Sequence, residues 1–257
     1  MGVFVLFCGM SLRASRILFW KGENTMNEIL LIGSLIVLYG SVLIFYKLFG
    51  NAGLYCYSAI ATVLANVEVL LLIDAFGMEM TLGNILFATT FIVTDILSET
   101  ESKEAAQKAV LLGVGCSVLF LFLSQSWLLY VPSASDWAAP AFHAIFKTAP
   151  RTMLSSLIVY TVTQWIDVLL YHFWWEVTRR RSGDSRRFLW LRNNVATLIS
   201  QLINTVLFTF CAFWGVFDLS TICEIIVSSY SIFIVTSLLD TPVIYLARHI
   251  HDKKMAD

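Results

Sequence analysis

Charged residues are scarce in this sequence. Asp, Glu, Lys and Arg make up 14% of the 257 residues, hydrophobic residues make up 58%, and the mean hydropathy is +0.76. Soluble domains carry about 25% charged residues. The composition therefore excludes a soluble one- or two-domain enzyme and predicts an integral membrane protein. The formal net charge of -1 leaves no basic excess, so we expect no direct nucleic-acid partner.

The sequence also lacks the motifs of metal and nucleotide chemistry. Its five cysteines are scattered through apolar stretches without a CxxC pair, which excludes a disulfide or zinc framework. The phosphate-binding motif GxxxxGK[ST] is absent, so a separate ATPase subunit would have to supply any ATP-driven step. We predict no metal, no cofactor and no catalytic residue.

Long apolar runs are abundant instead. A helix needs about 20 residues to cross a hydrocarbon core of about 30 Å. The runs are continuous and lack the period-two alternation of membrane barrels, so we predict an all-α, polytopic transmembrane helix bundle without a soluble domain. The seven predicted spans are residues 29–49, 54–73, 82–98, 107–131, 151–175, 192–217 and 221–247.

Basic residues predict the orientation of the bundle. Five arginines lie in the connection 176–190, and Arg248, Lys253 and Lys254 follow in the C-terminal tail. If both segments are cytoplasmic, seven spans place twelve basic residues inside and only Lys147 and Arg151 outside. We therefore expect a multi-pass protein of the cell (inner) membrane with a cytoplasmic C-terminus.

The first 25 residues do not fit this pattern. Arg13, Arg16 and Lys21 follow a short apolar run, whereas a signal peptide has its basic residues before that run. Met26 opens a better apolar helix. We expect residues 1–25 to be an upstream extension of the reading frame or a disordered N-terminus.

Polar side chains form stripes along several spans. The sixth span has Asn193, Thr197, Ser200, Gln201 and Asn204 on one helical face. Ionisable and amide side chains within spans face a cavity or a partner helix, where they either join helices or line a binding site. Further candidates at helical spacing are Asn66 in the second span, Thr94, Asp95 and Glu99 in the third, Tyr160, Gln164 and Asp167 in the fifth, Asn194 in the sixth and Asp240 in the seventh.

Carboxylates and amides dominate this inward set, and cations are few. A buried carboxylate binds two adjacent N–H groups with charge assistance, and a phenol ring stacks on a flat base. The set suits a small, flat ligand that is rich in hydrogen-bond donors, such as the N1–H and 2-amino edge of a guanine-like base.

Three segments resemble the queuosine precursor transporter family: TDILSE at residues 94–99, RTMLSSLIVYTVTQWID at 151–167 and LRNNVATLISQLINT at 191–205. The resemblance covers about residues 54–247. It implies a six-helix transporter core at 51–257 with a cytoplasmic tail, similar to the substrate-binding subunits of energy-coupling-factor transporters. Residues 26–50 would then be an extra N-terminal transmembrane helix.

The resemblance also implies import of a 7-deazaguanine base, such as queuine or a precursor of it, for tRNA modification. In that role Asp95, Asp167 and Asn204 would accept hydrogen bonds from N–H groups of the base, and the ring of Tyr160 would stack on the face of the base. The energy source stays open between proton coupling, facilitated uptake and an ATPase module. A homo-oligomer is also left open.

Two alternative functions remain at this stage. One is a substrate-binding subunit for another vitamin-like molecule that works with a separate ATPase. The other is an intramembrane aspartyl hydrolase that uses two of Asp95, Asp167 and Asp240 as an acid and base pair.

Overall fold

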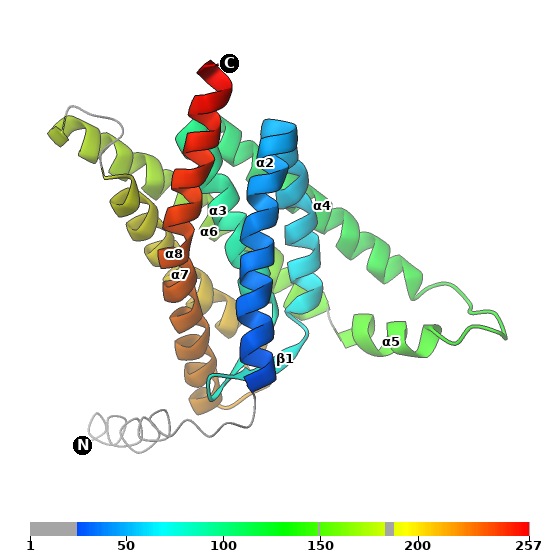
Figure 1. The fold of residues 1–257 in the computed structure, drawn as a ribbon. Coiled ribbons are helices and arrows are strands. Elements are labelled where there is room, and N and C mark those ends of the chain that lie inside the picture. The colour runs from blue at the N-terminus through cyan, green and yellow to red at the C-terminus, as the bar shows by residue number, and fades with distance from the viewer. Residues whose placement is uncertain (1–24, 149, 183–187, 257) are drawn as a thin grey trace, which may run out of the picture.

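The computed structural model describes residues 25–148, 150–182 and 188–256, and these form a helix bundle with one short hairpin (Figure 1). The predicted all-α bundle is confirmed. The expected extension at 1–25 lies, apart from Thr25, outside the described residues. The elements are α2 (Thr25–Glu68), β1 (Leu72–Ala75), β2 (Met78–Thr81), α3 (Gly83–Thr100), α4 (Lys103–Trp127), α5 (Ala139–Thr148), α6 (Pro150–Ser182), α7 (Leu189–Phe213) and α8 (Leu219–Ala256).

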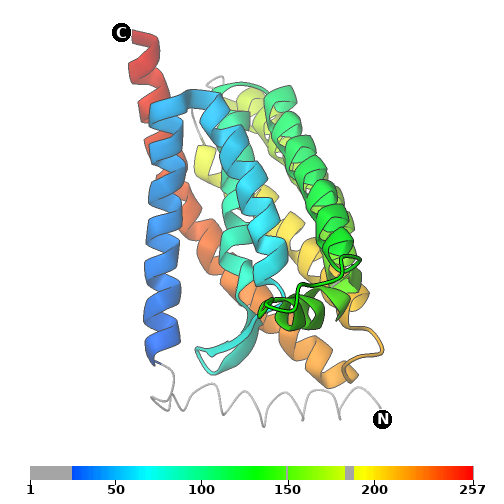
Figure 2. The same cartoon turned by 90° about the vertical axis from the view of Figure 1, so that its right-hand side faces the viewer.

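The first two predicted spans are the two arms of α2. The helix folds back at Gly50, whose backbone angles (φ 60°, ψ -140°) are open to glycine but not to a residue with a side chain. The arms, residues 25–49 and 51–68, run side by side (Figure 2).

The second predicted span, residues 54–73, extends past the end of the helix. Its helix stops at Glu68, and residues 72–81 form an antiparallel hairpin that the sequence analysis did not predict. Phe76 and Gly77 both have positive φ, as tight hairpin turns require. Glu28 accepts a hydrogen bond from the backbone N of Phe76 at 3.0 Å, so the start of α2 holds the hairpin in place.

Five described helices are long and apolar enough to cross a membrane: α2, α4, α6, α7 and α8. With its kink, α2 accounts for two spans. The remaining predicted span is α3, which has 18 residues, 15 of them buried. It packs against α2, α4, α6 and α8, and a helix buried all round belongs at the centre of a bundle.

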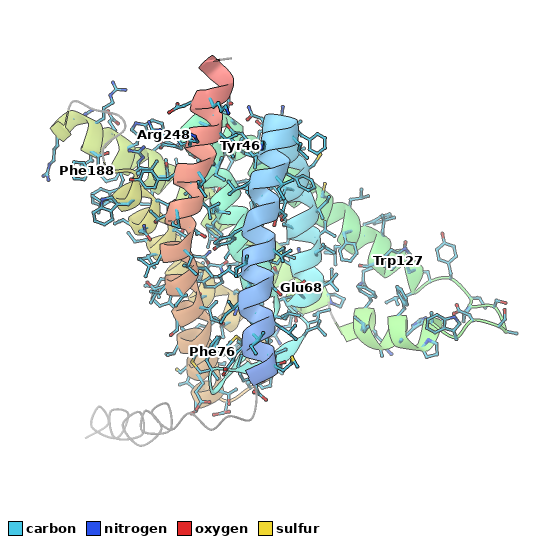
Figure 3. The ribbon with its side chains drawn as sticks, in the orientation of Figure 1. Tyr46, Glu68, Phe76, Trp127, Phe188 and Arg248 are labelled. Atoms are coloured by element: carbon cyan, nitrogen blue, oxygen red, sulfur yellow. The ribbon has the colours of Figure 1, made fainter. Side chains whose placement is uncertain are left out.

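The two ends of the bundle differ in what they carry. At one end lie the kink of α2, the α3–α4 turn, the end of α6 with Arg179–Arg181 and the end of α8 (Figure 1). We call this the basic end. At the other, the hairpin end, lie the hairpin, α5 and the α7–α8 connection; Glu68 and Phe76 are labelled there in Figure 3, and Arg248 near the basic end.

The connection between the fourth and fifth predicted spans contains a further helix. This helix, α5, packs through Phe142 and Phe146 against Trp127, with ring centroids 5.8 and 5.6 Å apart. In the α7–α8 connection, Thr221 donates a hydrogen bond to Asp218 at 2.5 Å, and this bond lowers the pKa of that carboxyl group.

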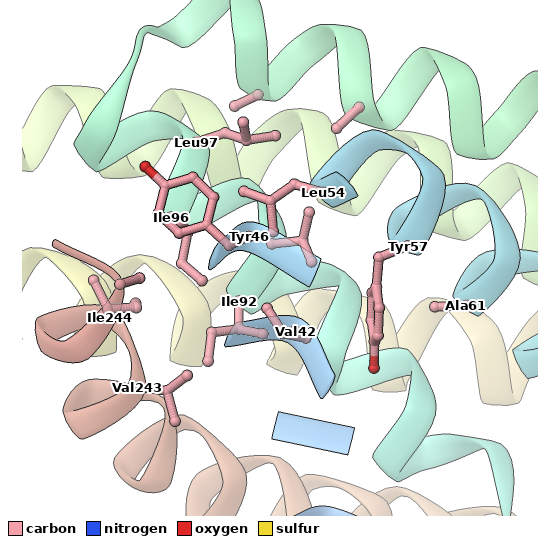
Figure 4. Close-up of a cluster of buried hydrophobic side chains, with 14 of the residues drawn as sticks. Val42, Tyr46, Leu54, Tyr57, Ala61, Ile92, Ile96, Leu97, Val243 and Ile244 are labelled. Carbon is pink, nitrogen blue, oxygen red and sulfur yellow. The ribbon is translucent and has the colours of Figure 1, made fainter. Parts of the chain in front are cut away.

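The main apolar core joins both arms of α2 to α3 and α8. Val42 and Tyr46 of the first arm pack with Leu54 of the second, with Ile92 of α3 and with Ile244 of α8 (Figure 4). The first arm, predicted as an extra helix outside a six-helix core, therefore shares the core of the others.

Candidate substrate-binding site

Two carboxylates meet in the middle of the bundle. Asp95 of α3 accepts a hydrogen bond from Thr197 Oγ1 at 3.2 Å, and Asp167 of α6 accepts one from Ser200 Oγ at 2.6 Å. All four side chains are at most 2% exposed, and the two carboxyl groups interact with each other. The polar stripe of α7 thus orients one oxygen of each carboxylate.

The other polar atoms of this layer lack partners. Among the described residues, Asp95 Oδ1, Asp167 Oδ2, Gln201 Oε1 and both amide atoms of Asn193 are buried without a hydrogen bond. Native proteins rarely leave buried polar atoms unpaired, because each costs about 1–3 kcal/mol. Several such atoms on three helices, most of them acceptors, mark a place where a ligand with N–H donors is complementary. We call Asp95, Asp167, Thr197 and Ser200 the central layer; on α7, Gln201 follows Ser200 directly, and Asn193 lies about one turn from Thr197 toward Arg192.

Three further residues that were predicted for the site already have protein partners: Thr94, Gln164 and Asn204. Gln164 donates to Thr90 Oγ1 at 2.8 Å and accepts from Thr94 Oγ1 at 3.2 Å, which joins α6 to α3. Asn204 accepts from Thr163 Oγ1 at 3.3 Å, which joins α7 to α6. These bonds position the helices that carry the central layer.

Tyr160 and Asn66 extend the site toward the hairpin end. Tyr160 is 1% exposed, accepts a hydrogen bond from Thr62 Oγ1 at 3.3 Å and packs edge-on against the ring of Phe87. Asn66 donates to Ser117 Oγ at 3.3 Å, and its Oδ1 has no partner in the described chain.

Asn194 and Asp240 lie on the α8 side. Asn194 donates to Thr241 Oγ1 at 2.7 Å and accepts from Ser237 Oγ at 3.2 Å, so it fastens α7 to α8 and does not join the central layer. Asp240 accepts a hydrogen bond from the hydroxyl of Tyr39, and its carboxyl group interacts with Asp95 and Asp167. Sequence reasoning missed Tyr39, because a tyrosine in an apolar run carries no signal of its distant partner.

Glu99, also predicted for the site, belongs to a second polar group one turn closer to the basic end. It is hydrogen-bonded to Arg192 and to Tyr171 OH, the latter at 2.7 Å, and it pairs with Arg248 at 2.6 Å. We call Glu99, Tyr171, Arg192 and Arg248 the Glu99 cluster. Arg248 was counted in the sequence analysis only as an orientation signal.

The described part of the chain has hollows in at least two places. One, about 130 Å³, lies between the arms of α2 and is lined by apolar side chains and Tyr57. The other lies between the central layer and the hairpin end and is lined in part by Asn84, Phe87, Ser156, Asn204 and Phe233. Its volume of about 30 Å³ suits one or two waters, so side chains must move before a base can enter.

No group of three or more His, Cys, Asp or Glu side chains in the described ranges is arranged to hold a metal ion. The unpartnered polar groups at the centre of the bundle are carboxylates and amides, which bind ligands through hydrogen bonds.

Comparison with known proteins gives a consistent result. Residues 81–247 match the family model "Putative vitamin uptake transporter". The chain is 39% identical over 207 residues to the "Probable queuosine precursor transporter" of Bacillus subtilis (strain 168), covering 80% of this chain and 88% of that protein. It is 27% identical over 150 residues to the "Queuosine precursor transporter" of Escherichia coli (strain K12), covering 58% and 62%. No solved structure matches significantly.

The matched range includes α3, α6 and α7, which carry the central layer, and the Bacillus subtilis relative spans most of the chain. The apolar helices and these relatives agree on a multi-pass membrane protein. The chain belongs to this family of vitamin uptake transporters.

Proposed function

We propose that this protein imports a queuosine precursor, a 7-deazaguanine base, across the cell membrane for tRNA modification, with the basic end in the cytoplasm. The names of its two relatives support the substrate, and the excess of basic residues at one end supports the orientation.

The observation that carries the proposal is the central layer. Among the described residues, Asp95 Oδ1 and Asp167 Oδ2 are buried acceptors without partners. A guanine-type edge offers adjacent N–H donors, which a carboxylate binds through two parallel hydrogen bonds. Asn193 has both a free donor and a free acceptor, and it would pair with the ring carbonyl or a remaining N–H group.

The role of Tyr160 follows from its position. Its ring packs edge-on against Phe87, which lines the hollow toward the hairpin end, and Thr62 donates a hydrogen bond to its hydroxyl. A base that enters from the hairpin end would pass this ring, and stacking on an aromatic face contributes about 1–3 kcal/mol per base.

The hydrolase alternative uses the same carboxylates, but the names of the relatives describe transport, and no described contact favours bond cleavage over binding. An ATPase partner and a homo-oligomer stay open, as they were in the sequence analysis.

Uptake in a host that neither makes nor imports 7-deazaguanine bases tests the function. Cells that express the protein and are supplied with a labelled precursor should gain queuosine in their tRNA, and cells that express Asp167→Asn should not. If the wild-type protein reaches the membrane and the tRNA gains no queuosine, the proposed function is wrong.

A further inference from the structure

The Glu99 cluster forms a complete layer between the candidate site and the basic end. Glu99 lies four residues after Asp95 on α3, and Tyr171 lies four residues after Asp167 on α6. Four residues advance a helix by about 6 Å, so the two layers are stacked one turn apart. Arg192 precedes Ala196 and Ser200 on the same face of α7, and α8 contributes Arg248.

This layer is tightly closed. The side chains of Glu99 and Arg192 are 1% and 0% exposed, and the Arg192 guanidinium lies 4.8 Å from the ring centroid of Trp175. The single side chain of Glu99 contacts three other helices: α6 through Tyr171, α7 through Arg192 and α8 through Arg248. A substrate in the central layer therefore has no route to the basic end while these bonds hold.

The weakest part of the layer is the α8 contribution. The Arg248 side chain is 17% exposed and meets Glu99 through one ion pair. Pro242 lies inside α8, between Asp240 and Arg248, and a proline within a helix removes a backbone hydrogen bond and allows bending there. Beyond Pro242, α8 is also held by a 3.0 Å contact between Tyr46 OH and His251 Nδ1.

We propose that the Glu99 cluster is the gate at the basic end, and that it opens when the part of α8 beyond Pro242 swings away and separates Arg248 from Glu99. As a step in transport, this gate depends on the proposed function. Separating one partner from a buried ion pair is costly unless water reaches both charges, and the partly exposed Arg248 is the charge that water reaches first. The present conformation is closed at the basic end, and the smaller hollow lies on the hairpin side of the central layer.

Thiol labelling tests the gate without any substrate. In a variant whose five cysteines are replaced, Ala196→Cys places one reporter between the two layers, at a position that is 0% exposed. A membrane-impermeant thiol reagent is applied to inside-out vesicles and, separately, to intact cells. The comparison distinguishes labelling from the face that bears the C-terminal tail from labelling from the opposite face. Arg248→Gln should speed labelling from that face by about tenfold or more, which equals about 1.4 kcal/mol in the opening equilibrium.

Glu101→Gln is the matched control, because Glu101 is an exposed carboxylate two residues from Glu99. It should leave the labelling rate unchanged, and Arg248→Lys, which keeps the charge, should restore much of the protection. Arg248→Gln is preferred to changes of Glu99, because it leaves the Glu99–Arg192 pair in place and should therefore disturb the fold less.

The outcomes separate the gate from the transported substrate. If Arg248→Gln labels no faster than the parent while the parent imports the precursor, the gate is wrong and the proposed function stands. If labelling rises but the parent imports no precursor, the cluster is a gate in a carrier of another substrate. Equal acceleration by Glu101→Gln would also overturn the proposal, because it would show a general loosening of the bundle.

Discussion

Asn193 and Asn194 are neighbours on α7, yet the structure uses them in opposite ways. The amide of Asn194 donates to Trp190 O of its own helix and to Thr241 Oγ1 of α8, and it accepts from Ser237 Oγ of α8, so it joins α7 to α8. The amide of Asn193 is fully buried, and neither its nitrogen nor its oxygen has a partner among the described residues. One asparagine is committed to the fold and the other is available to a ligand.

Alanine substitution of the two asparagines should separate stability from transport. Asn194→Ala leaves Thr241 and Ser237 without their partner and should lower the free energy of unfolding by about 1–3 kcal/mol. Asn193→Ala removes two unpaired polar atoms, so it should leave stability unchanged or raise it while precursor uptake falls. Thermal unfolding of purified protein and uptake by cells measure the two effects, and a reversed pattern would contradict the assignment.

Isosteric neutralisation of the central carboxylates should weaken precursor binding with little change in side-chain volume. Asp167→Asn and Asp95→Asn each replace one of the two carboxylate oxygens by an NH₂ group. Each change also removes the negative charge that strengthens hydrogen bonds from N–H donors. We expect uptake to fall by about tenfold or more for each, since charge-assisted hydrogen bonds contribute about 1.5–3 kcal/mol. Glu79→Gln, an exposed carboxylate of the hairpin, is the control and should transport normally.

The helices and their polar faces could be predicted from the sequence because both depend on local periodicity. A continuous apolar run of about 20 residues has few alternatives to a membrane helix. The stripe from Asn193 to Asn204 faces the bundle interior as predicted, and it brings Thr197 to Asp95 and Ser200 to Asp167. Spacing on one helix was enough to place these groups on a common face.

Contacts that depend on distant helices could not be predicted. The partner of Asp240 is Tyr39, 201 residues away, and Glu99 binds arginines of α7 and α8 that a linear reading treats as orientation signals. The hairpin at 72–81 was missed because Leu72 and Ile73 continue the apolar run of α2. Its turn at Phe76 and Gly77 needs positive φ at both positions, and Phe76 gives no sign of this.

Gly113 should tolerate no side chain, whereas Gly115, on the same helix, should accept one. A Cβ at Gly113 would lie 2.8 Å from Thr62 Oγ1 and 2.9 Å from Tyr160 OH, and a Cβ at Gly115 would meet nothing within 4 Å. Gly113→Ala should displace Tyr160 and destabilise the protein by about 1–3 kcal/mol through overpacking. Gly115→Ala should be neutral or stabilise α4 by up to about 1 kcal/mol. Thermal unfolding compares them, and equal effects would contradict the close packing of α4 on Tyr160.

The basic end should face the cytoplasm. A tag after residue 257 should be protected from protease in intact cells and cleaved in inside-out vesicles, because basic connections are retained on the cytoplasmic side. A second tag in the loop before α5, for example after Ser135, should show the reverse pattern. If both tags are cleaved from the same face, the predicted number of crossings between them is wrong.

The first arm of α2 should contribute to stability as part of the core. The Tyr39 hydroxyl donates to Asp240 and lies 3.3 Å from Thr236 O, and both residues belong to α8. Tyr39→Phe removes this donor while keeping the ring, so a buried carboxylate oxygen loses its partner. The free energy of unfolding should fall by about 1–3 kcal/mol.

Tyr245→Phe is the control for this change, because Tyr245 is 45% exposed on α8 and its hydroxyl makes no hydrogen bond with the described residues. Its unfolding temperature should match that of the parent. If Tyr39→Phe is equally silent, then the first arm packs beside the other helices without holding Asp240. The prediction that residues 26–50 are an addition to a self-sufficient six-helix core would then gain support.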